Sequence, residues 1–383
     1  MLEVLELVEY LAIFGVVCWY AVIFLPWRPC EVREKLECPV SVDEPPITDP
    51  PVTDITVLIP ARDEGLYIQR TLAGVKQQSV KTQIIVIDDQ SSDDTAEQAL
   101  ACNAQVISGT SPPPGWSGKL WALQQGLQHV KTPFTLLLDA DIELAPGIVA
   151  ELHKKALAEN LSLVSLMAEP PMMNFIERLL MPAFIFFFKL LYPFNLANKM
   201  TSPIAAAAGG CILIKTETLH AINAFSSLHT ALIDDCTLAA YVKRTGERTW
   251  IGLSHAARSH RGYSGLMQIW NMVARTAFTQ LRYSSVLLIL CTFIMIAMFW
   301  IGPMAFLFSS TQLLLLIGMF SWIAMFFAYI HTLVYYQRSI LWVLALPLIG
   351  TLYLAMTWTS VLRYWNGERA HWKDRRYESK ANN

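Results

Sequence analysis

The chain has 383 residues, of which 54% are hydrophobic and only 16% are charged, and its formal net charge is −2. Soluble domains carry about a quarter charged residues, so this composition indicates membrane-spanning segments beside a soluble domain. A nearly neutral chain has little attraction for a nucleic-acid backbone, and we expect no nucleic-acid partner. The seven cysteines form no Cys-x-x-Cys pair, which argues against a zinc site or a disulfide scaffold and favours reduced thiols facing the cytosol.

Residues 1–27 are expected to form an N-terminal transmembrane anchor. Within them, Leu7 to Leu25 is apolar apart from Glu9 and is long enough to cross a bilayer as one helix. No basic residue precedes this segment and no small-x-small cleavage site follows it, which favours an anchor over a cleaved signal peptide. Acidic residues precede the segment and basic residues follow it, so the positive-inside rule places the next part of the chain in the cytosol.

Residues 28–54 are rich in proline and predict a stiff linker. From residue 55 to 285, short β-branched runs alternate with helical patterns, which favours an α/β domain with a mostly parallel sheet. The expected strands are nearly all apolar, as they are when helices cover both faces of a sheet. The strands are Ile55–Ile59, Gln83–Ile87, Gln105–Ile107 and Phe134–Leu138, and the helices between them are Gly65–Gln78, Thr95–Cys102 and Lys119–His129.

The segment 175–194 is rich in phenylalanine and leucine, yet it also carries three charged residues and two prolines. These interruptions favour a helix that lies in the membrane surface over a helix that spans the membrane. A span at this place would also put Asp139 and Asp235 on opposite sides of the membrane.

Residues 286–362 contain three apolar runs, each long enough to span a bilayer: Val286–Phe308, Leu313–Tyr336 and Ile340–Leu362. The basic tail, residues 363–383, conflicts with this topology, because a cytosolic middle domain followed by three spans would put the tail outside. A re-entrant or broken first run, with Gly302-Pro303 inside it, would resolve the conflict. The runs hold few charges, His331 being an exception, which argues against a transporter.

Two of the expected strands lead into polar residues that suit a nucleotide. In an open α/β sheet, ligands bind beyond the carboxyl ends of the strands. The first strand leads into Pro60, Ala61 and Glu64, although an ordinary strand exit explains that sequence equally well. The second leads directly into Asp88-Asp89, whose carboxylates could accept hydrogen bonds from a base or a ribose.

Asp139-Ala140-Asp141 follows the fourth expected strand. One intervening residue lets both carboxylates act on one ligand, and Mg²⁺ or Mn²⁺ prefers carboxylate oxygens and is commonly shared with phosphates. A diphosphate leaving group needs this neutralisation. A lone Asp-x-Asp is common by chance, but three acidic strand ends in sequence order are much less so. We therefore expect Asp139 and Asp141 to bind a metal beside a nucleotide diphosphate.

Three further motifs each have a functional and a purely structural interpretation. Lys119 begins a helix after a glycine-led turn and suits a phosphate, although a solvated lysine is equally compatible. Gly209-Gly210, expected on the acceptor or diphosphate side of the site, permits a close backbone approach or a mobile loop, and a packing site for small residues is the alternative. Asp234-Asp235 could include a general base, whereas capping is the usual role of an aspartate at a helix start.

Basic and aromatic residues just before the first late apolar run could contact a lipid head group or the departing diphosphate, or simply anchor the chain at the membrane interface. They are Arg275, Gln280, Arg282 and Tyr283. His255 and His260 have a weak case as metal ligands, and surface histidines without such a role are the simpler interpretation.

Taken in order, these motifs resemble those of the family 2 glycosyltransferases with a GT-A type nucleotide-diphospho-sugar domain, over about residues 52–285. The pattern is most similar to the hopene-associated glycosyltransferase group and more distantly to ceramide glucosyltransferases, because of residues 115–122 and 273–283. The motifs that carry the resemblance are residues 59–64 (Ile-Pro-Ala-Arg-Asp-Glu), Asp88-Asp89, Gly118-Lys119, Asp139-Ala140-Asp141 and Asp234-Asp235.

The resemblance implies a Rossmann-like GT-A fold, a UDP-sugar donor and a Mg²⁺ or Mn²⁺ ion. It implies an inverting transfer to a lipid acceptor, of hopanoid or isoprenoid type, by a multi-pass protein of the bacterial inner membrane with its catalytic domain in the cytosol. It implies that Pro60, Ala61 and Asp89 hold the uracil end of the donor, with Asp88 close by. It also implies that Asp139 approaches the ribose or the metal, that Asp141 binds the metal and that Asp235 is the base.

The sequence departs from the family pattern in two places. Asp234-Asp235 stands where Glu-Asp is usual, and Arg282-Tyr283 only partly matches the Gln-or-Arg-x-x-Arg-Trp motif of processive and ceramide-type enzymes. The second departure argues against polymer synthesis and against a ceramide acceptor. The remaining alternatives are a polyprenyl-phosphate sugar synthase, a polysaccharide synthase and a non-catalytic membrane protein that binds nucleotide-sugars.

Overall fold

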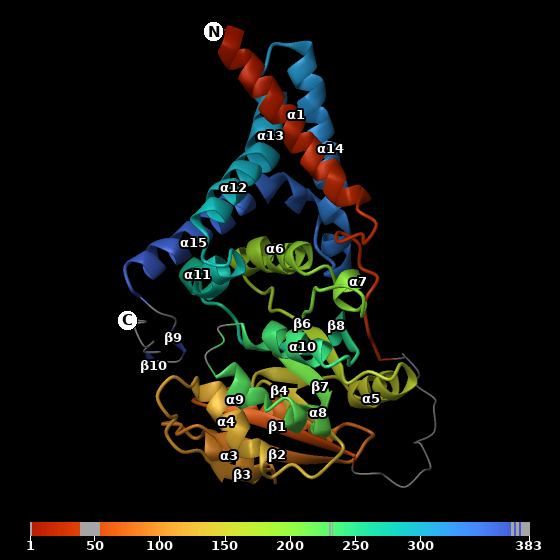
Figure 1. The fold of residues 1–383 in the computed structure, drawn as a ribbon, viewed down its shortest axis with the longest axis vertical. Coiled ribbons are helices and arrows are strands. Elements are labelled where there is room, and N and C mark those ends of the chain that lie inside the picture. The colour runs from red at the N-terminus through yellow and green to blue at the C-terminus, as the bar shows by residue number, and fades with distance from the viewer. Residues whose placement is uncertain are drawn as a thin grey trace. The chain divides into compact units, whose positions relative to one another are not determined.

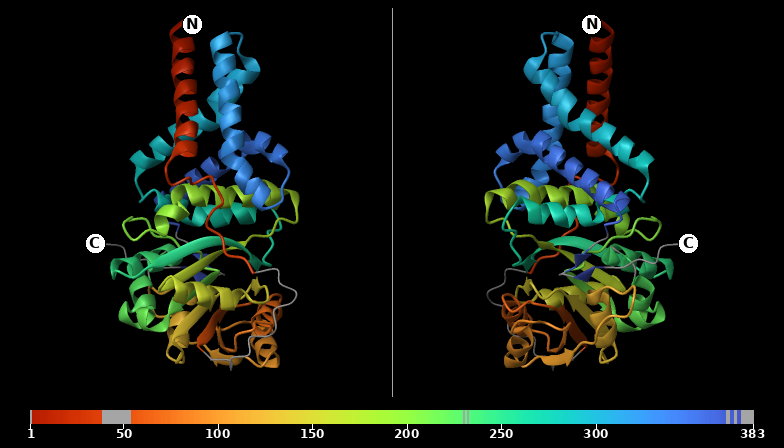
Figure 2. Two further views of the ribbon diagram at one scale, coloured as in Figure 1. Left: turned by 90° about the vertical axis from the view of Figure 1, so that its right-hand side faces the viewer. Right: turned by 90° about the vertical axis from the view of Figure 1, so that its left-hand side faces the viewer.

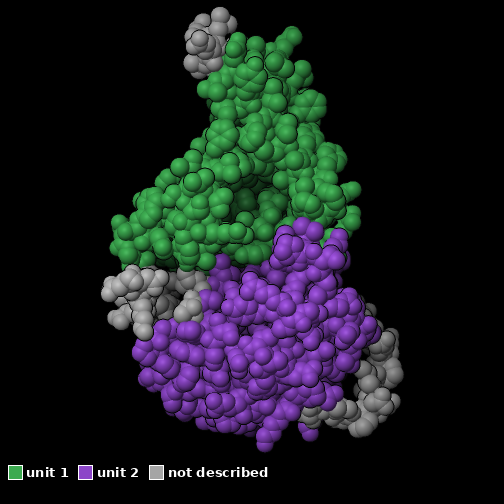
Figure 3. All heavy atoms as spheres, viewed as in Figure 1, with its two compact units in different colours: residues 1–33, 172–195, 263–368 green, residues 34–171, 196–262, 369–383 purple. Residues whose placement is uncertain are grey.

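The computed structural model describes residues 2–38, 54–229, 231, 233–368, 371–372 and 375–376. The chain divides into two compact units, which Figure 3 shows in different colours. Unit 1 comprises Met1–Arg33, Met172–Asn195 and Tyr263–Glu368, and unit 2 comprises Glu34–Pro171, Leu196–Gly262 and Arg369–Asn383. Most of the expected proline-rich linker and most of the expected basic tail lie outside the described residues.

Unit 2 is built on a mixed sheet, which among the described residues has eight strands in the order β3-β2-β1-β4-β7-β6-β8-β5 (Figure 1). Strands β1 to β4 are parallel, β7 is antiparallel to both of its neighbours, and β8 is parallel to β6 and antiparallel to β5. The predicted mostly parallel α/β sheet is therefore confirmed. The strands are β1 (Ile55–Ala61), β2 (Thr82–Asp88), β3 (Gln105–Ser108), β4 (Phe134–Leu138), β5 (Ile142–Leu144), β6 (Leu163–Glu169), β7 (Cys211–Lys215) and β8 (Thr249–Ser259). A short ribbon joins β9 (His371–Trp372) to β10 (Arg375–Arg376).

Helices cover both faces of this sheet, which explains why its central strands are almost wholly apolar. In β1, Val57 and Ile59 pack into one hydrophobic cluster with α2, α3 and α5, whereas Leu58 packs into a second cluster with α4, α8, α9 and α10. The helices are α2 (Ile68–Lys76), α3 (Thr95–Ala101), α4 (Gly118–Leu127), α5 (Ile148–Ala158), α8 (Thr216–Ala221), α9 (Ala224–Leu228) and α10 (Asp234–Arg244). The short helix α7 (Phe194–Ala197) lies where the chain passes from unit 1 into unit 2.

Helix α2 begins at Ile68, three residues later than the sequence predicts. The backbone N–H of Glu64 donates to the Thr95 hydroxyl (2.8 Å), and that of Gly65 donates to the Asp93 carboxylate (2.9 Å). These bonds hold the segment before α2 against the residues that lead into α3.

Unit 1 consists of helices: α1 (Leu2–Phe24), α6 (Phe175–Leu191), α11 (Leu266–Gln280), α12 (Ser285–Ile296), the π-helical turn η1 (Ala297–Ile301), α13 (Gly302–Phe308), α14 (Gln312–Tyr335), the 3₁₀ segment η2 (Ile340–Ala345) and α15 (Leu346–Trp365). Four stretches of the described chain are long and apolar enough to cross a membrane: Glu6–Phe24, Ser285–Phe308, Gln312–Tyr335 and Ile340–Trp365. They agree with the predicted transmembrane helices. Helices α1 and α14 lie side by side in both views of Figure 2.

Helix α6 corresponds to the predicted surface helix and begins with a capping box formed by Asn174 and Glu177. Its charges have partners inside unit 1: Lys189 donates to the Glu31 carbonyl, and Glu177 accepts the Tyr263 N–H (2.6 Å). Helix α6 and residues 263–285 belong to unit 1, so the contact-based units divide the chain differently from the predicted domain at 55–285. A position in the membrane surface stays a prediction for α6.

The first late apolar run is one continuous helix with a π-helical turn, and it is not broken at Pro303 as the sequence allowed. A π-turn changes the partners of its backbone carbonyls, and the indole N–H of Trp19 donates to the Met298 carbonyl there (2.8 Å). Gly15 lies against the same turn, since a Cβ at this position would be 2.2 Å from the Ala297 oxygen. Helix α1 therefore docks on η1 through a glycine and a tryptophan one turn apart.

Replacing Gly15 with leucine should separate α1 from η1, because even a Cβ has no room there. We expect a stability loss of about 1–3 kcal/mol, the usual cost of overpacking, seen as a lower unfolding temperature in detergent. Gly265→Leu is a matched control, because nothing lies within 4 Å of a Cβ at that position. Equal unfolding temperatures for the two variants would contradict the docking of α1 on η1.

Candidate functional site

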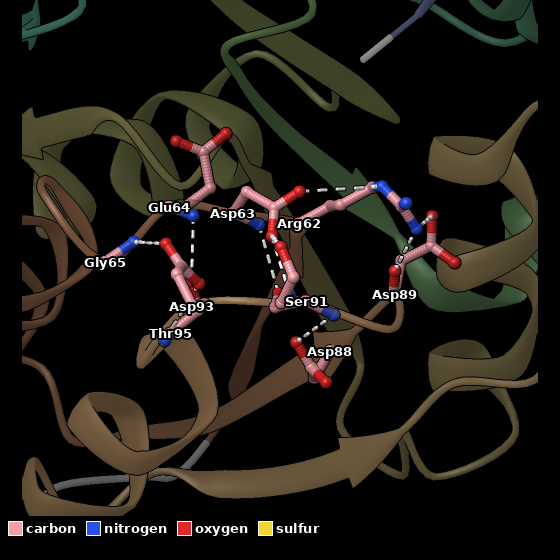
Figure 4. A network of polar contacts seen from close by, with 10 residues as sticks. Arg62, Asp63, Glu64, Gly65, Asp88, Asp89, Ser91, Asp93 and Thr95 are labelled. Carbon is pink, nitrogen blue, oxygen red and sulfur yellow. Dashed lines mark hydrogen bonds and ion pairs between the residues drawn. The ribbon is translucent and has the colours of Figure 1, made fainter. Parts of the chain in front are cut away.

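The loops that follow β1 and β2 are joined by a network of hydrogen bonds and ion pairs (Figure 4). Arg62 donates to the Asp89 carbonyl (2.8 Å), and the backbone N–H of Asp63 donates to the Ser91 hydroxyl (3.1 Å). The Asp63 carboxylate in turn accepts the Ser92 N–H (2.7 Å). Asp63 adopts a left-handed φ of 50°, which lets its backbone and side chain both face the second loop. The two strand ends are therefore held together as one rim.

The predicted nucleotide-binding residues lie at this rim. Pro60 and Ala61 end β1 and Asp88 ends β2. Asp89 is only 1% exposed, and its N–H donates to the Ala61 carbonyl (2.8 Å). The Asp88 carboxylate accepts the Ser91 N–H (3.3 Å). The structure thus brings Pro60, Ala61, Asp88 and Asp89 together, and their roles toward a base or ribose stay predictions.

A pocket in unit 2 brings together four charged residues and a glycine, from α4, the end of β4, the segment before β7 and the start of α10. They are Lys119, Asp139, Gly209, Asp234 and Asp235. The Ser117 hydroxyl accepts the Leu120 N–H (3.1 Å) and so caps α4, which fixes the first turn that carries Lys119. The Lys119 ammonium lies 2.5 Å from a carboxylate oxygen of Asp139.

Lys119 is the cation that balances this acidic pocket. Burial lowers the pKa of Lys119, but the carboxylates of Asp139, Asp234 and Asp235 outweigh burial and hold that pKa above its usual range. The pKa of Asp139 is raised, chiefly by burial, with Lys119 opposing the rise and Asp141 adding to it. One ammonium therefore faces several carboxylates, which leaves negative charge that suits a further cation.

Asp235 is held through both of its carboxylate oxygens. One accepts the Gly209 N–H (2.8 Å) and the other accepts the Cys236 N–H (2.7 Å). Burial and the neighbouring Asp234 carboxylate raise the pKa of Asp235 to about 6. The N-cap of α10 is Ile233, so Asp235 is not the helix cap that its sequence position suggested. A fixed carboxylate with such a pKa is suited to removing a proton near neutral pH.

The glycine pair before β7 is explained by close backbone approach. A Cβ at Gly209 would lie 3.3 Å from the Asp235 carboxylate and 3.6 Å from the Lys119 amine. The Gly210 carbonyl accepts the Asp139 N–H (3.0 Å). The pair thereby ties the end of β4 to the start of α10.

Asp141 contacts residues at the end of β8. Its carboxylate lies 3.3 Å from Arg261 Nε and accepts the Ser259 hydroxyl (3.2 Å). Arg261 also pairs with Glu64 from the loop after β1. Neither Ser259 nor Arg261 was expected from the sequence. The only available signal was a polar run, Ser259 to Arg261, at the end of an apolar strand.

The carboxylates of Asp139 and Asp141 fit a divalent cation that is shared with a diphosphate, because they offer oxygen ligands at an incompletely neutralised strand end. Within the described part of the chain, no group of three or more His, Cys, Asp or Glu side chains is gathered as a metal cage. Lys119 pairs with Asp139 and Arg261 with Asp141. The remaining oxygen ligands of such a cation would therefore have to come from the nucleotide.

The two histidines have carboxylate partners of their own. The His255 ring lies 3.4 Å from Glu169, and the His260 ring pairs with Glu143. The His260 N–H also donates to the Asp141 carbonyl (2.9 Å), which joins the ends of β5 and β8.

Among the residues predicted on the acceptor or diphosphate side, Gly209 and Gly210 belong to unit 2, whereas the four residues from 275 to 283 belong to unit 1. Gln280 accepts the hydroxyl of Tyr192 (2.6 Å), and the Tyr283 ring stacks on Tyr364 at 4.8 Å. Arg282 and Tyr283 both have positive φ, 51° and 55°, where the chain turns out of α11. A role for Arg275, Gln280, Arg282 and Tyr283 toward an acceptor stays a prediction.

Residues 56–222 match the family model described as glycosyl transferase family 2, and they include Lys119, Asp139 and Gly209 of the pocket. Residues 56–222 therefore form a domain similar to family 2 glycosyltransferases. This match confirms the family inferred from the sequence motifs. Asp234 and Asp235 lie beyond the matched residues.

Curated relatives of this domain are 4,4'-diaponeurosporenoate glycosyltransferases. The protein of Staphylococcus haemolyticus (strain JCSC1435) is 38% identical over 92 residues, which are 24% of this chain and 24% of that protein. The protein of Staphylococcus aureus (strain USA300) is 37% identical over 89 residues, which are 23% of this chain and 24% of that protein. The chain thus spans about a quarter of the length of the curated relatives it matches.

Among solved structures, the chain resembles the mannosyltransferase PcManGT from Pyrobaculum calidifontis, solved in complex with GDP-Man and Mn²⁺. The two chains superpose with a TM-score of 0.53 at 15% identity, covering 94% of this chain and 99% of the other. At this identity the likeness shows the fold alone.

Gly209→Ala should impair turnover more than donor binding. The added methyl group would lie 3.3 Å from the Asp235 carboxylate, which has to shift by a few tenths of an ångström and so moves away from its N–H donor. We expect kcat to fall about tenfold, as for a small misplacement of a catalytic group, with the affinity for UDP nearly unchanged. Isothermal titration with UDP and a UDP-release assay measure the two effects separately. Equal losses in both would contradict a role centred on Asp235.

Proposed function

We propose that the protein is an inverting glycosyltransferase that moves a sugar from a UDP-sugar to a hydroxyl group of a lipid acceptor. The observation that carries this proposal is the Asp235 carboxylate, fixed by the Gly209 N–H in the pocket that also holds Lys119 and Asp139. A transferase of this kind needs a base for the acceptor and positive charge for the leaving diphosphate, and the pocket offers both.

In the proposed reaction, Asp235 removes the proton from the acceptor hydroxyl while the acceptor oxygen attacks the anomeric carbon from the face opposite the diphosphate. The bond from the anomeric carbon to the diphosphate oxygen breaks, and the sugar configuration inverts. Lys119 stabilises the negative charge that develops on the diphosphate. Pro60, Ala61, Asp88 and Asp89 orient the nucleoside at the rim.

Asp139 and Asp141 would hold a Mg²⁺ or Mn²⁺ ion, which when bound neutralises charge on the diphosphate. The solved mannosyltransferase with a similar fold contains GDP-Man and Mn²⁺, which supports a nucleotide-sugar and a divalent ion in general terms. The choice of UDP rests on the resemblance of the motifs at Pro60 to Asp89.

Two features support a lipid acceptor. The described chain contains four candidate membrane spans, and the curated relatives are named for a lipid-like acceptor, 4,4'-diaponeurosporenoate. A multi-pass protein with its sheet domain in the cytosol would meet such an acceptor at the membrane. A hopanoid or another isoprenoid-type lipid remains our candidate from the motif resemblance.

A polyprenyl-phosphate sugar synthase is the main competing proposal. A phosphate monoester is largely ionised at neutral pH, with a second pKa of about 6, so its oxygen needs no strong base. The raised pKa and fixed orientation of Asp235 therefore favour a hydroxyl acceptor. Product analysis distinguishes the two, and it would reveal a polysaccharide product as well.

Asp235→Asn tests the proposed base. The amide keeps the shape of the side chain and can still accept the Gly209 N–H, but it cannot take a proton. We expect turnover with a lipid extract of the native host to fall by about 10²–10⁴-fold, with UDP affinity within about twofold of the unaltered protein. Unchanged turnover would refute Asp235 as the base. Donor binding without transfer by the unaltered protein would instead support a non-catalytic nucleotide-sugar-binding protein.

The raised pKa of Asp235 predicts opposite pH dependences for activity and stability. Activity should rise as pH passes about 6, because the base must be deprotonated. Stability should fall over the interval from about 4, the ordinary aspartate value, to about 6, because the unfolded state releases the proton first. Thermal unfolding measures the stability and UDP release measures the activity, each between pH 4 and 8. In Asp235→Asn, the fall in stability and the rise in activity that come from this carboxylate should both be absent.

A further inference from the structure

Arg261 joins two acidic residues from different parts of the sheet domain, Glu64 after β1 and Asp141 just before β5. Its Nε lies 3.3 Å from the Asp141 carboxylate, and its Nη2 pairs with the Glu64 carboxylate. The antiparallel register of β5 with β8 pairs Ile142 with Ser259, and this register brings Arg261 to Asp141. The sheet therefore fixes the backbone positions from which the two side chains meet.

The surroundings of Arg261 keep the guanidinium charged and in place. It lies over the Tyr67 ring, 5.2 Å from the ring centre. Burial lowers the pKa of Arg261, but Glu64 and Asp141 outweigh burial and raise that pKa above its usual range. Glu64 is 7% exposed, and in Figure 4 its carboxylate points away from the network that joins Asp63 to the second loop.

The pair Arg261–Asp141 conflicts with the use of Asp141 as a metal ligand. A guanidinium and a divalent cation repel each other, and the same carboxylate cannot neutralise both at close range. Glu64 offers Arg261 a second partner, so Arg261 can release Asp141 without becoming an unpaired charge. Its planar fork of five N–H donors also suits a diphosphate.

We infer that Arg261 is an internal competitor of the divalent cation at Asp141, and that it is released when a nucleotide diphosphate gives it another anionic partner. This inference rests on the proposed function. It makes metal binding weak in the absence of nucleotide and strongly coupled to nucleotide binding. By thermodynamic reciprocity, the metal tightens nucleotide binding by the same factor.

The test is the affinity of the full-length protein in detergent for Mn²⁺, measured by electron paramagnetic resonance with and without UDP. For the unaltered protein, UDP should tighten Mn²⁺ binding by about fivefold or more. In Arg261→Gln, Mn²⁺ binding without UDP should become tighter by a similar factor, and the effect of UDP should shrink toward none. A purely structural arginine predicts the reverse, because its loss would loosen the site and weaken Mn²⁺ binding.

Arg258→Gln is the matched control. Arg258 is an exposed arginine three residues earlier that pairs with Glu169, and its loss changes the net charge equally. It should leave both Mn²⁺ affinities unchanged, so a shift shared by the two variants would overturn the inference as a general charge effect. If Arg261→Gln does not fold, Arg261→Lys replaces it. A lysine cannot pair with both carboxylates through a planar fork, so Mn²⁺ binding without UDP should still tighten, by a smaller factor.

The outcomes separate the inference from the proposed function. Unchanged or weaker Mn²⁺ binding by Arg261→Gln, with metal-dependent UDP binding by the unaltered protein, overturns the competitor role alone. Failure of the unaltered protein to bind UDP or GDP with Mn²⁺ overturns the proposed function and the competitor role together.

Discussion

The ammonium group of Lys119 is the charge on which the pocket depends. Three partly buried carboxylates, those of Asp139, Asp234 and Asp235, face it from two different elements. Without a cation between them, their mutual repulsion and the cost of burial would favour separation of β4 from α10. The Ser117 cap fixes the first turn of α4, from which Lys119 reaches the carboxylates. The absence of a side chain at Gly209 leaves space beside the lysine amine.

The parts of the site that follow parallel strands were predictable from the sequence. Parallel neighbours end at the same sheet edge, so Asp88, Asp89 and Asp139 could be placed near one another once their strands were recognised. The contacts of Asp235 with Gly209 and of Asp141 with Arg261 were not predictable. The second joins residues 120 positions apart through an antiparallel pairing that no local pattern specifies.

The helical parts show the same limit. Composition identified the apolar helices, because length and hydrophobicity are local properties. Composition did not show that charged side chains of α6 are hydrogen-bonded inside unit 1, as Lys189 is to the Glu31 carbonyl. It also could not show that the residues leading into α3 accept hydrogen bonds from the backbone N–H groups of Glu64 and Gly65, just before α2.

The hydrogen bond from Trp19 to the Met298 carbonyl has a consequence for biosynthesis. The two residues are 279 positions apart, so α1 leaves the ribosome long before its docking turn exists. A helix inserted alone in a bilayer is stable, since its backbone is already hydrogen-bonded. Helix α1 therefore lacks this partner while the sheet domain is synthesised, and the helical unit closes only after η1 and α14 have been made. Misassembly at that late step would leave a finished sheet domain joined to an unfinished helical unit.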